Sequence, residues 1–550
     1  MKRCFKALGA FSLTLALALT LWASPLGAVA QAAEDEYEGE YAGYLVILDD
    51  QPAAVSFYSG GEATLMAAYN EREELLPLAE DMGIYKAGDL DQIQNLVWSG
   101  QVLSAEPDYK AELFDVSDLP ADHLDPTKPD DPYFIEQNRN HQYNLKDSDA
   151  HGVGVRAAWD AGLTGEGVTV AVIDSGLNLD HNDVPAKVAR GRYYFYREEP
   201  GGRYQYTVNG VTKNYNYYSN DYVLDDLPNG HGTMVSGIIA ANKDNGIGIA
   251  GAAPGVTLMP VRCFTNTPGH LGGYVSNLIS GVTYAMNNGA NVINMSWGIA
   301  NDSAALRRVI TQAANQGCIL IAAVGNDGNS RVQYPAAWDN VIGVGATDKS
   351  GYLADYSQRN DSVAVCAPGS QVWSLSNSSN DLYRQNNGTS FSAPLVAACA
   401  ALLKEADPTM TQADFAQLLQ GNCDEIRFKA PADQDYGGAG IVNMRKMLDA
   451  VGYAGATMTR NGDTLTARAA YHPVQGESQT ASGAVLMLGA YNAQGHLLDS
   501  QVAIPTLSGY GSYSLLAQFD HPDVATLRAF YLKNDGTLAA VAAPAELAAR

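Results

Sequence analysis

Short apolar runs alternate with helical patterns between residues 131 and 453, and this alternation limits the possible folds of the 550-residue chain more than any other feature. Runs that are apolar almost throughout are typical of strands buried on both faces of a parallel sheet. The helical patterns between them supply the crossovers that parallel strands need. We therefore expect an α/β domain, a parallel sheet with helices on both faces. The clearest strand runs are Val168–Ile173, Val292–Met295, Cys318–Ala323 and Val341–Val344, and the clearest helical patterns are Tyr274–Asn288 and Ala304–Gln316.

The segments on either side of this region have different patterns, as a chain too long for one hydrophobic core should. Before it, a strand pattern at Tyr44–Leu48 and a helical pattern at Asn70–Ala79 indicate a small α+β unit. A Pro/Asp-rich linker, Asp115–Asp131, then separates this unit from the α/β domain. After it, residues alternate in period two around turn signals at Asn492–Gly495 and Asn534–Gly536, which indicates a small all-β sandwich.

The N-terminal residues have the pattern of a secretory signal peptide. Lys2, Arg3 and Lys6 precede an apolar run, Ala7–Trp22, and small residues follow at Ala28–Ala33. A retained membrane anchor is the alternative, but the run is short for a bilayer span and cleavage-type residues follow it. We expect a secreted protein with no membrane association after signal cleavage.

Charge and cysteine content exclude several classes of function. The chain has 60 acidic and 34 basic residues, a formal net charge of −26, which would repel phosphate backbones and anionic lipid surfaces. We therefore expect no nucleic-acid or membrane-surface partner. Cys4 belongs to the signal segment, and the remaining odd number of cysteines shows no metal-type spacing, which favours buried free thiols over a disulfide framework. These five are Cys263, Cys318, Cys366, Cys399 and Cys423.

Three polar residues stand at predicted element boundaries. Asp174 ends a buried strand, at the carboxyl edge where active sites of α/β folds gather. His231, within Asn229–Thr233, directly precedes an apolar helical run, and Ser390, within Asn387–Pro394, precedes a helix that is apolar around its whole circumference. Each has an ordinary explanation when taken alone: a helix cap, a solvated loop histidine and a serine N-cap. Their joint occurrence favours a shared site.

The chemistry of acyl transfer needs these residue types together. A serine hydroxyl becomes a nucleophile when a neutral imidazole takes its proton, and a buried carboxylate holds that imidazole in the right tautomer. A helix N-terminus keeps His231 neutral, because it disfavours the imidazolium. Asn326, in Ala322–Gly328 after a buried strand, can offer its amide to the oxyanion beside the Ser390 N–H. The sequence thus predicts a serine hydrolase.

Over most of residues 131–453 the chain resembles the subtilisin-like serine proteases. The resemblance implies a secreted endopeptidase that acts on polypeptides through an acyl-enzyme and is made as an inactive precursor. It also implies a signal peptide at 1–33, a prodomain at 34–118, a catalytic domain at 128–453 and a C-terminal β-sandwich at 457–550. The matching segments are Ala171–Gly176, His231–Thr233, Asn294–Gly298, Gly325–Asn326 and Gly388–Pro394.

The same resemblance implies how a substrate binds. One cleft strand would pair with an extended polypeptide, two glycines would face it across the cleft, and a primary pocket would lie beside Asn326. We expect no strict requirement for a basic residue in that pocket. The implied substrate-binding residues are Ser296, Trp297 and Gly298 in the strand, Gly272 and Gly273 opposite, and Ala323 and Gln333 at the pocket.

The resemblance also implies a structural Ca²⁺ and an intramolecular inhibitor. Asp131, Asp183 and Asn245 occupy the positions of family calcium ligands, and hard oxygen donors suit Ca²⁺. The loop around Asn245, Lys243–Ile249, is one residue longer than usual, so a plain loop with solvated acids is the alternative. The prodomain would assist folding and block the cleft until the chain is cut within the Asp115–Asp131 linker.

Other functions remain open on the sequence alone. A secreted binding protein could keep the fold without turnover, although nothing in the fold requires the four polar residues. The C-terminal sandwich could bind carbohydrate or a surface, but it lacks an obvious aromatic cluster, which favours a packing role. A Tyr-rich insertion, Tyr193–Tyr222, either rims the cleft or forms a surface hairpin. Met234 stands where the family often has a second histidine.

Overall fold

The structure is a computed structural model of the whole chain. It describes most of the α/β region and parts of the two flanking units. The described residues are 41–48, 75–88, 96, 101–114, 142–146, 151–193, 204–208, 211–215, 223–225, 227–265, 273–461, 464–474, 484–505, 513–534, 540, 542 and 544–548. The predicted signal peptide and most of the predicted linker lie outside them.

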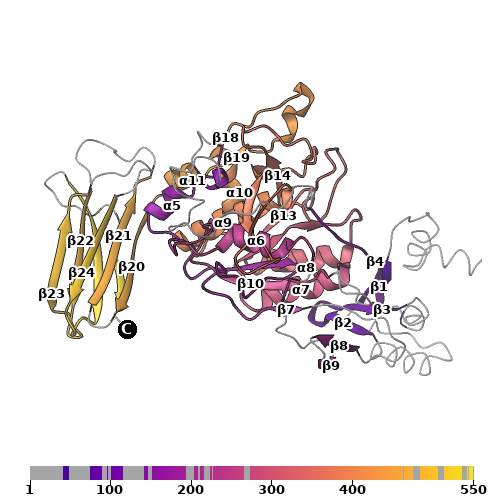
Figure 1. Cartoon of the computed structure of the whole chain (residues 1–550), viewed down its shortest axis with the longest axis horizontal. Coiled ribbons are helices and arrows are strands. Elements are labelled where there is room, and N and C mark those ends of the chain that lie inside the picture. Colours follow the sequence, from indigo (N-terminus) through magenta and orange to yellow (C-terminus); the bar gives the residue numbers. More distant parts are fainter. Residues whose placement is uncertain are drawn as a thin grey trace, which may run out of the picture.

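A nine-stranded sheet forms the centre of the molecule, and neighbouring strands are parallel except at one edge, where β18 is antiparallel to β19. The expected α/β architecture is therefore confirmed (Figure 1). In sheet order the strands are β18 (Cys423–Asp424), β19 (Ile441–Val442), β15 (Val365–Pro368), β14 (Ile342–Thr347), β13 (Ile319–Ala323), β11 (Val292–Met295), β6 (Thr169–Asp174), β10 (Thr257–Arg262) and β7 (Arg192–Tyr193).

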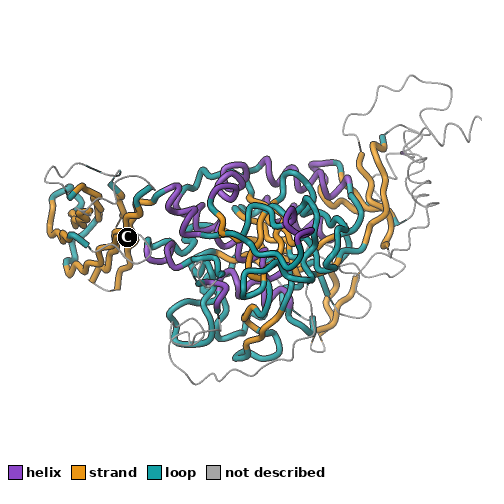
Figure 2. The backbone as a smooth tube through the Cα atoms, turned by 90° about the horizontal axis from the view of Figure 1, so that it is seen from above, coloured by secondary structure: helices purple, strands orange, loops and turns teal. Residues whose placement is uncertain are grey.

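Helices cover both faces of this sheet (Figure 2). Successive strand residues point to opposite faces, and in β6 Val170 and Val172 join one apolar core while Ala171 and Ile173 join the other. The first core is covered by α5 (Arg156–Asp160), α6 (His231–Ala240), α9 (Thr389–Ala406), α10 (Gln412–Gly421) and α11 (Met444–Val451). The second is covered by α7 (Val275–Asn287) and α8 (Ala304–Asn315).

An N-terminal four-stranded sheet packs on α7 and α8. Its antiparallel strands, in the order β2, β3, β1 and β4, are Leu76–Ala79, Ile84–Ala87, Tyr41–Leu48 and Val102–Tyr109. Leu45, Ile47 and Ile84 enter the core shared with α7 and α8. The prediction of a helix over Asn70–Ala79 is wrong for residues 76–79, which form β2 because pairing with β3 and burial of Leu78 outweigh local helix propensity. Residues 70–74 lie outside the described part.

Two antiparallel sheets follow the α/β domain and share one apolar core. Arg468 joins them to the domain, since its guanidinium donates to the carbonyl oxygens of Trp159 and Asp160 at 3.3 and 2.5 Å. The first sheet contains β20 (Tyr453–Asn461), β21 (Thr464–His472) and β24 (Tyr513–Asp520). The second contains β23 (Leu497–Ala503), β22 (Ala484–Tyr491), β25 (Thr526–Lys533) and β26 (Ala545–Ala548).

Three two-stranded sheets complete the strand inventory of the described residues. They are β8 (Tyr204–Val208) with β9 (Val211–Tyr215), β16 (Val372–Leu375) with β17 (Tyr383–Asn386), and β5 (Glu112–Leu113) with β12 (Trp297–Gly298). The β8–β9 pair lies within the Tyr-rich insertion. The β5–β12 pair joins the N-terminal unit to the α/β domain.

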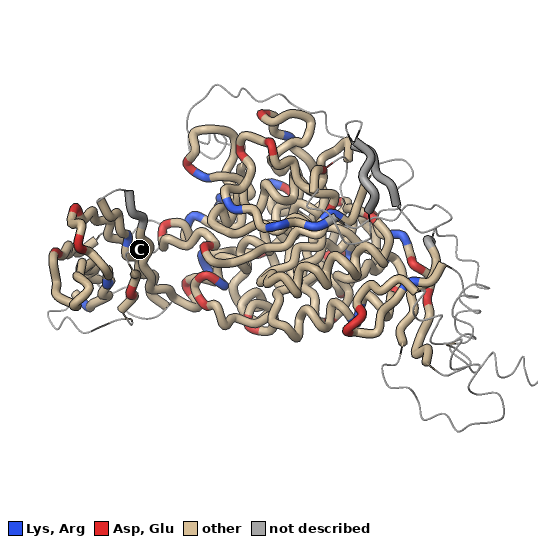
Figure 3. The backbone as a smooth tube through the Cα atoms, turned by 90° about the horizontal axis from the view of Figure 1, so that it is seen from below, with Lys and Arg blue, Asp and Glu red and all other residues tan. Residues whose placement is uncertain are grey.

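The cysteines that the structure describes are all free, as predicted. Cys263, Cys318, Cys366 and Cys399 are buried, whereas Cys423 is only half-buried. Acidic positions are spread along the three units rather than gathered in one patch (Figure 3). Every helix in the described residues is too short or too polar to cross a membrane.

Candidate active site

Asp174 and His231 form a buried pair at the carboxyl edge of the large sheet. Asp174 is the last residue of β6 and His231 is the first residue of α6. Their atoms Oδ1 and Nδ1 lie 2.7 Å apart, and both side chains are fully buried. Gly230 has a left-handed conformation (φ 62°), and a Cβ there would lie 2.4 Å from Asn377 Oδ1, so the turn before His231 requires glycine. The loop and strand thus fix the imidazole against the carboxylate.

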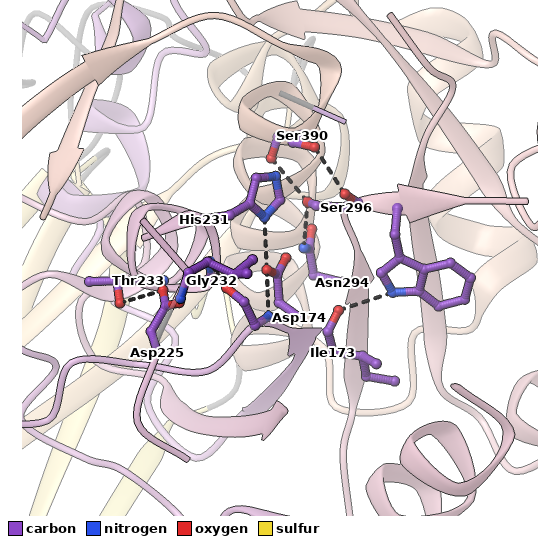
Figure 4. Close-up of polar contacts among 12 residues, drawn as sticks. Ile173, Asp174, Asp225, His231, Gly232, Thr233, Asn294, Ser296 and Ser390 are labelled. Atoms are coloured by element: carbon purple, nitrogen blue, oxygen red, sulfur yellow. Dashed lines mark hydrogen bonds and ion pairs between the residues drawn. The ribbon is translucent and has the colours of Figure 1, made fainter. Parts of the chain in front are cut away.

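Ser390 lies on the other side of the imidazole. It is the second residue of α9, and Figure 4 shows the His231 ring between Asp174 and Ser390. The ring of Phe391, the next residue, packs on the His231 ring at 5.7 Å between centroids. The Ser390 hydroxyl donates to the carbonyl oxygen of Ser296 at 2.9 Å, so its proton must be redirected before it can pass to the imidazole. The structure brings the three predicted residues together from β6, α6 and α9.

Asn326 lies beside the start of α9, and hydrogen bonds from Thr389 fix the orientation of its side-chain amide. Its Oδ1 accepts from the Thr389 nitrogen and from the Thr389 hydroxyl, both at 2.9 Å. Its Nδ2 is buried and makes no hydrogen bond within the described residues. The Thr389 contacts decide which end of the amide faces the site, because only Oδ1 can accept them. An N–H donor of Asn326 therefore lies beside the turn that precedes Ser390.

An extended segment of the N-terminal unit occupies the predicted substrate cleft. Strand β5 pairs with β12 in antiparallel register, Leu113 opposite Trp297 and Glu112 opposite Gly298. On the far side of the segment, the Ala111 nitrogen donates to the Gly273 carbonyl at 2.5 Å. The predicted cleft residues therefore hold an extended polypeptide between them. Gly272 lies outside the described residues.

The predicted pocket residues border one space beside this segment. A Cβ on Gly298 would lie 2.3 Å from Phe114 Cζ and 3.3 Å from Gln333 Cβ, and a Cβ on Gly325 would lie 3.2 Å from Gln333 Cγ. Gln333 is 6% exposed, and Ala323 ends β13 fully buried. The structure therefore brings Gly298 and Gln333 together beside Phe114.

Comparison with known proteins identifies the family. The model of the Subtilase family matches residues 165–444. M-protease of Shouchella clausii (strain KSM-K16) is 31% identical over 441 residues, 80% of this chain and 98% of that protein. The chain belongs to the subtilase family of serine proteases.

Other subtilases match shorter stretches. The Minor extracellular protease Epr of Bacillus subtilis (strain 168) is 34% identical over 316 residues, 57% of this chain but only 43% of that relative. Subtilisin BL of Lederbergia lenta is 34% identical over 287 residues, 52% of this chain and 93% of its own length. A solved protease from Pseudoalteromonas arctica PAMC 21717 has 28% identity and a TM-score of 0.47, covering 59% of this chain and 99% of that one.

The sequence did not reveal a layer of buried polar residues behind Asp174 and His231 in this subtilase. Asp225 accepts from the Thr233 nitrogen and hydroxyl at 2.9 and 2.8 Å, and burial raises its pKa. Ser175 Oγ accepts from the Gly232 nitrogen at 2.8 Å. Together they fix the first turn of α6, which carries His231 (Figure 4). Asp225 lies six residues before His231, but no spacing rule marks it as a partner of that turn.

A second series of hydrogen bonds links Asn294, Ser296 and Ser390. Asn294 Nδ2 donates to Ser296 Oγ at 2.9 Å, and Ser296 Oγ donates to the Ser390 carbonyl at 3.0 Å. Trp297 Nε1 donates to the Ile173 carbonyl at 3.0 Å and ties the cleft strand to β6. The sequence marked Asn294 only as part of a matching segment and gave it no role.

Two of the three predicted calcium ligands lie together. Asp183 is fully buried; its two carboxylate oxygens accept from Asn245 Nδ2 at 2.7 Å and from the Ile249 nitrogen at 3.0 Å. Asp131 lies outside the described residues. Among the described residues, no group of three or more His, Cys, Asp or Glu side chains could hold a metal ion. A carboxylate is a hard oxygen donor of the kind that suits Ca²⁺. Asn245 turns its amide nitrogen to Asp183, and its Oδ1 accepts from the Ile247 nitrogen at 3.1 Å. The described part therefore supplies one carboxylate of the predicted ligand set.

Proposed function

We propose that this subtilase is a secreted serine endopeptidase that hydrolyses polypeptides through an acyl-enzyme. Ser390 is the nucleophile, His231 the general base, Asp174 the residue that orients the imidazole, and Asn326 an oxyanion donor. The observation that carries the proposal is the buried 2.7 Å contact between Asp174 and His231, with Ser390 on the other side of the ring.

The steps follow from the geometry. The Ser390 hydroxyl turns from the Ser296 carbonyl and gives its proton to His231 Nε2 while Oγ attacks the substrate carbonyl. Asp174 accepts from Nδ1–H, which leaves Nε2 as the basic nitrogen and stabilises the imidazolium that forms. Asn326 Nδ2 and the Ser390 N–H donate to the oxyanion. His231 then protonates the leaving amine, and a water molecule activated by the same ring releases the acyl group.

We infer that residues 34–118 are a prodomain that acts as an intramolecular inhibitor. Two of its carboxylates accept hydrogen bonds at the N-termini of the helices on which it packs, where backbone N–H groups have no partner within the helix. Glu106 accepts from Ser303 Oγ, Ala304 N and Ala305 N at α8, at 2.6, 2.9 and 3.0 Å. Asp108 accepts from the Ser276 nitrogen and hydroxyl at α7, at 2.8 and 2.7 Å. These contacts support docking across the entrance of the cleft.

The remaining parts of the proposal concern location and stability. Secretion is supported by the predicted signal peptide at 1–33 and by the printed name of one relative, an extracellular protease. We assign 128–453 to the catalytic domain and 457–550 to a β-sandwich with a packing role, supported by the Arg468 contacts. A structural Ca²⁺ would be held by Asp183, Asn245 and Asp131 and would stabilise the loop after α6.

A serine-directed fluorophosphonate tests the catalytic assignment. The native chain should be labelled once and should cleave peptides, whereas Ser390→Ala should do neither. Ser392→Ala is the matched control, because Ser392 is buried two residues further along α9 and donates to the Ala367 carbonyl. Labelling of Ser390→Ala, or a folded native chain that is neither labelled nor active, would favour the alternative of a non-catalytic binding protein.

A further inference from the structure

The main chain of Phe114 contacts the catalytic groups directly. Its carbonyl oxygen accepts from the Ser390 nitrogen at 3.2 Å, and its own nitrogen donates to the Ser296 carbonyl at 3.3 Å. The Ser390 N–H is one of the two donors that the oxyanion needs. The Phe114 carbonyl therefore lies where a carbonyl under attack would lie.

The position of residues 110–113 fixes the register of the segment. Lys110 bridges to Tyr274, Ala111 binds Gly273, and β5 pairs with β12 as far as Leu113. Pairing on both sides leaves no freedom to slide by one residue, because such a slip would turn every side chain to the opposite face. Phe114 is therefore placed beside Ser390 by the whole segment.

The side chain of Phe114 fills the primary pocket. It is 6% exposed and joins the apolar core that contains Phe391. Its Cζ occupies the space that a Cβ on Gly298 would need, 2.3 Å away. Gly298 is not held in the left-handed region, so a side chain there would be excluded by the Phe114 ring rather than by backbone strain. The pocket is thus deep enough for an aromatic ring because residue 298 lacks a side chain.

The other residues of the segment are less selective. Glu112 is exposed and Leu113 is partly exposed, whereas Ala111 is buried in the core that contains Phe264. Recognition of this stretch therefore rests on main-chain pairing, on a small residue at Ala111 and above all on the ring of Phe114.

We infer that Phe114–Asp115 is the bond that the chain cuts first in its own maturation, and that the same pocket selects polypeptide substrates with an aromatic residue before the cut bond. This inference rests on the proposed function and adds to it the bond and the class of substrate. The predicted linker begins at Asp115, so the cut separates the docked segment from it.

The reaction at this bond is a hydrolysis. Ser390 Oγ bonds to the Phe114 carbonyl carbon and its proton passes to His231; the carbon–nitrogen bond to Asp115 then breaks, and His231 protonates the departing nitrogen. Water adds to the acyl carbon, giving one proton to His231, which returns it to Ser390 Oγ. The products are a Phe114 carboxylate and an Asp115 amine, and one water molecule is consumed.

The full-length chain tests the assignment of the bond. Intact mass and N-terminal sequencing at the earliest time of maturation should find one fragment that ends at Phe114 and another that begins at Asp115. Ser390→Ala should stay uncut. A first cut at any other bond in an active, fluorophosphonate-labelled chain would overturn the inference and leave the proposed function standing. An unlabelled, inactive native chain would defeat the proposed function itself.

The native mature enzyme tests the substrate class, and variants of Phe114 in the full-length chain test it during maturation. A peptide series that differs only at the residue before the cut should give kcat/KM at least about 100-fold higher for Phe than for Gly, because an empty apolar pocket loses its binding energy. Phe114→Tyr should mature at close to the native rate and Phe114→Gly more slowly by a similar factor. Equal kcat/KM for Phe and Gly peptides would overturn the aromatic preference.

Gly298→Ala supplies the complementary test. The added methyl group would lie 2.3 Å from the position of Phe114 Cζ, so the ratio of kcat/KM for Phe over Ala peptides should fall at least about tenfold. A ratio that does not change would contradict the assigned position of the ring.

Discussion

Thr389 holds the side-chain oxygen of Asn326 with two hydrogen bonds, one from its nitrogen and one from its hydroxyl, both 2.9 Å long. Thr389 directly precedes Ser390, so the residue that orients the amide also begins the helix that carries the proposed nucleophile. The proposed oxyanion donors and the hydroxyl are therefore positioned by the same turn.

Replacing Asn326 should separate transition-state stabilisation from binding. Asn326→Ala removes a donor aimed at the developing oxyanion, so kcat should fall about 10²–10³-fold while KM changes little. Peptide kinetics measure the change. Thr389→Val keeps the main-chain contact and loses the hydroxyl contact, so its loss in kcat should be smaller. A large rise in KM with unchanged kcat in Asn326→Ala would mean that the amide binds substrate in its ground state.

Asp174→Asn should leave the fold intact and nearly abolish turnover. An amide at this position donates to Nδ1 instead of accepting from it, which puts the imidazole in the wrong tautomer, and the expected loss in kcat is about 10⁴-fold, as in other triads. Asp225→Asn is the control, because the Asp225 side chain contacts the first turn of α6 but not the imidazole. This substitution should lower the unfolding temperature and reduce kcat by less than about tenfold. Comparable losses in the two variants would contradict the division of roles.

The release of the N-terminal unit should depend on pH through Glu106. Burial raises the pKa of Glu106 above its usual 4.5, with a smaller contribution from Asp302. A raised carboxyl pKa stabilises docking below the ordinary pKa, and this stabilisation is lost as pH rises through the raised value. After the first cut, the unit should therefore leave faster as pH increases from about 4.5 towards neutrality.

The lag before full activity, compared between the native chain and Glu106→Gln at each pH, measures this effect. The ratio cancels the pH dependence of catalysis itself, because both proteins share the same catalytic groups. Release from the native chain should accelerate relative to the variant as pH rises. A ratio that stays constant or moves the other way would contradict the assignment.

The sequence was most informative where chemistry and element boundaries coincide. Asp174, His231 and Ser390, which the structure brings together, could be proposed from the sequence because each stands where an apolar run begins or ends, which is a local signal. The contact of Phe114 with Ser390 joins residues far apart in the chain and has no local signal. The strand at 76–79 was mistaken for a helix for the same reason, since its pairing with β3 is a tertiary effect.

The supporting residues illustrate the same limit. Asp225 and Asn294 act through Thr233 and Ser296, and nothing in their spacing distinguishes them from other polar residues near a motif. Their role appears only once the strands place them beside α6 and β12.

The five described cysteines should be unreactive in the native enzyme. Burial raises the pKa of Cys318 to about 11 and that of Cys423 to about 12, so at pH 8 only about one Cys318 thiol in a thousand is ionised. A thiol-reactive probe should modify little of the native mature protein and all five thiols after denaturation. Fast modification of the native enzyme, or fewer than five thiols after denaturation without reductant, would contradict the assignment of buried free cysteines.

Chelation of calcium should lower the thermal resistance of the mature enzyme. Any ion that binds only the folded state stabilises it by RT ln(1 + [L]/Kd), about 2.7 kcal/mol when the free ion is at 100 times Kd. Melting temperatures with added Ca²⁺ and with a chelator should therefore differ by several degrees. Asp183→Asn should remove most of this difference, because it replaces the buried carboxylate with a neutral group. If the chelator lowered the melting temperature of the variant as much as that of the native enzyme, the ion would bind elsewhere. If the chelator did not change the melting temperature of the native enzyme, the contacts of Asp183 with Asn245 and Ile249 would hold the loop without a metal.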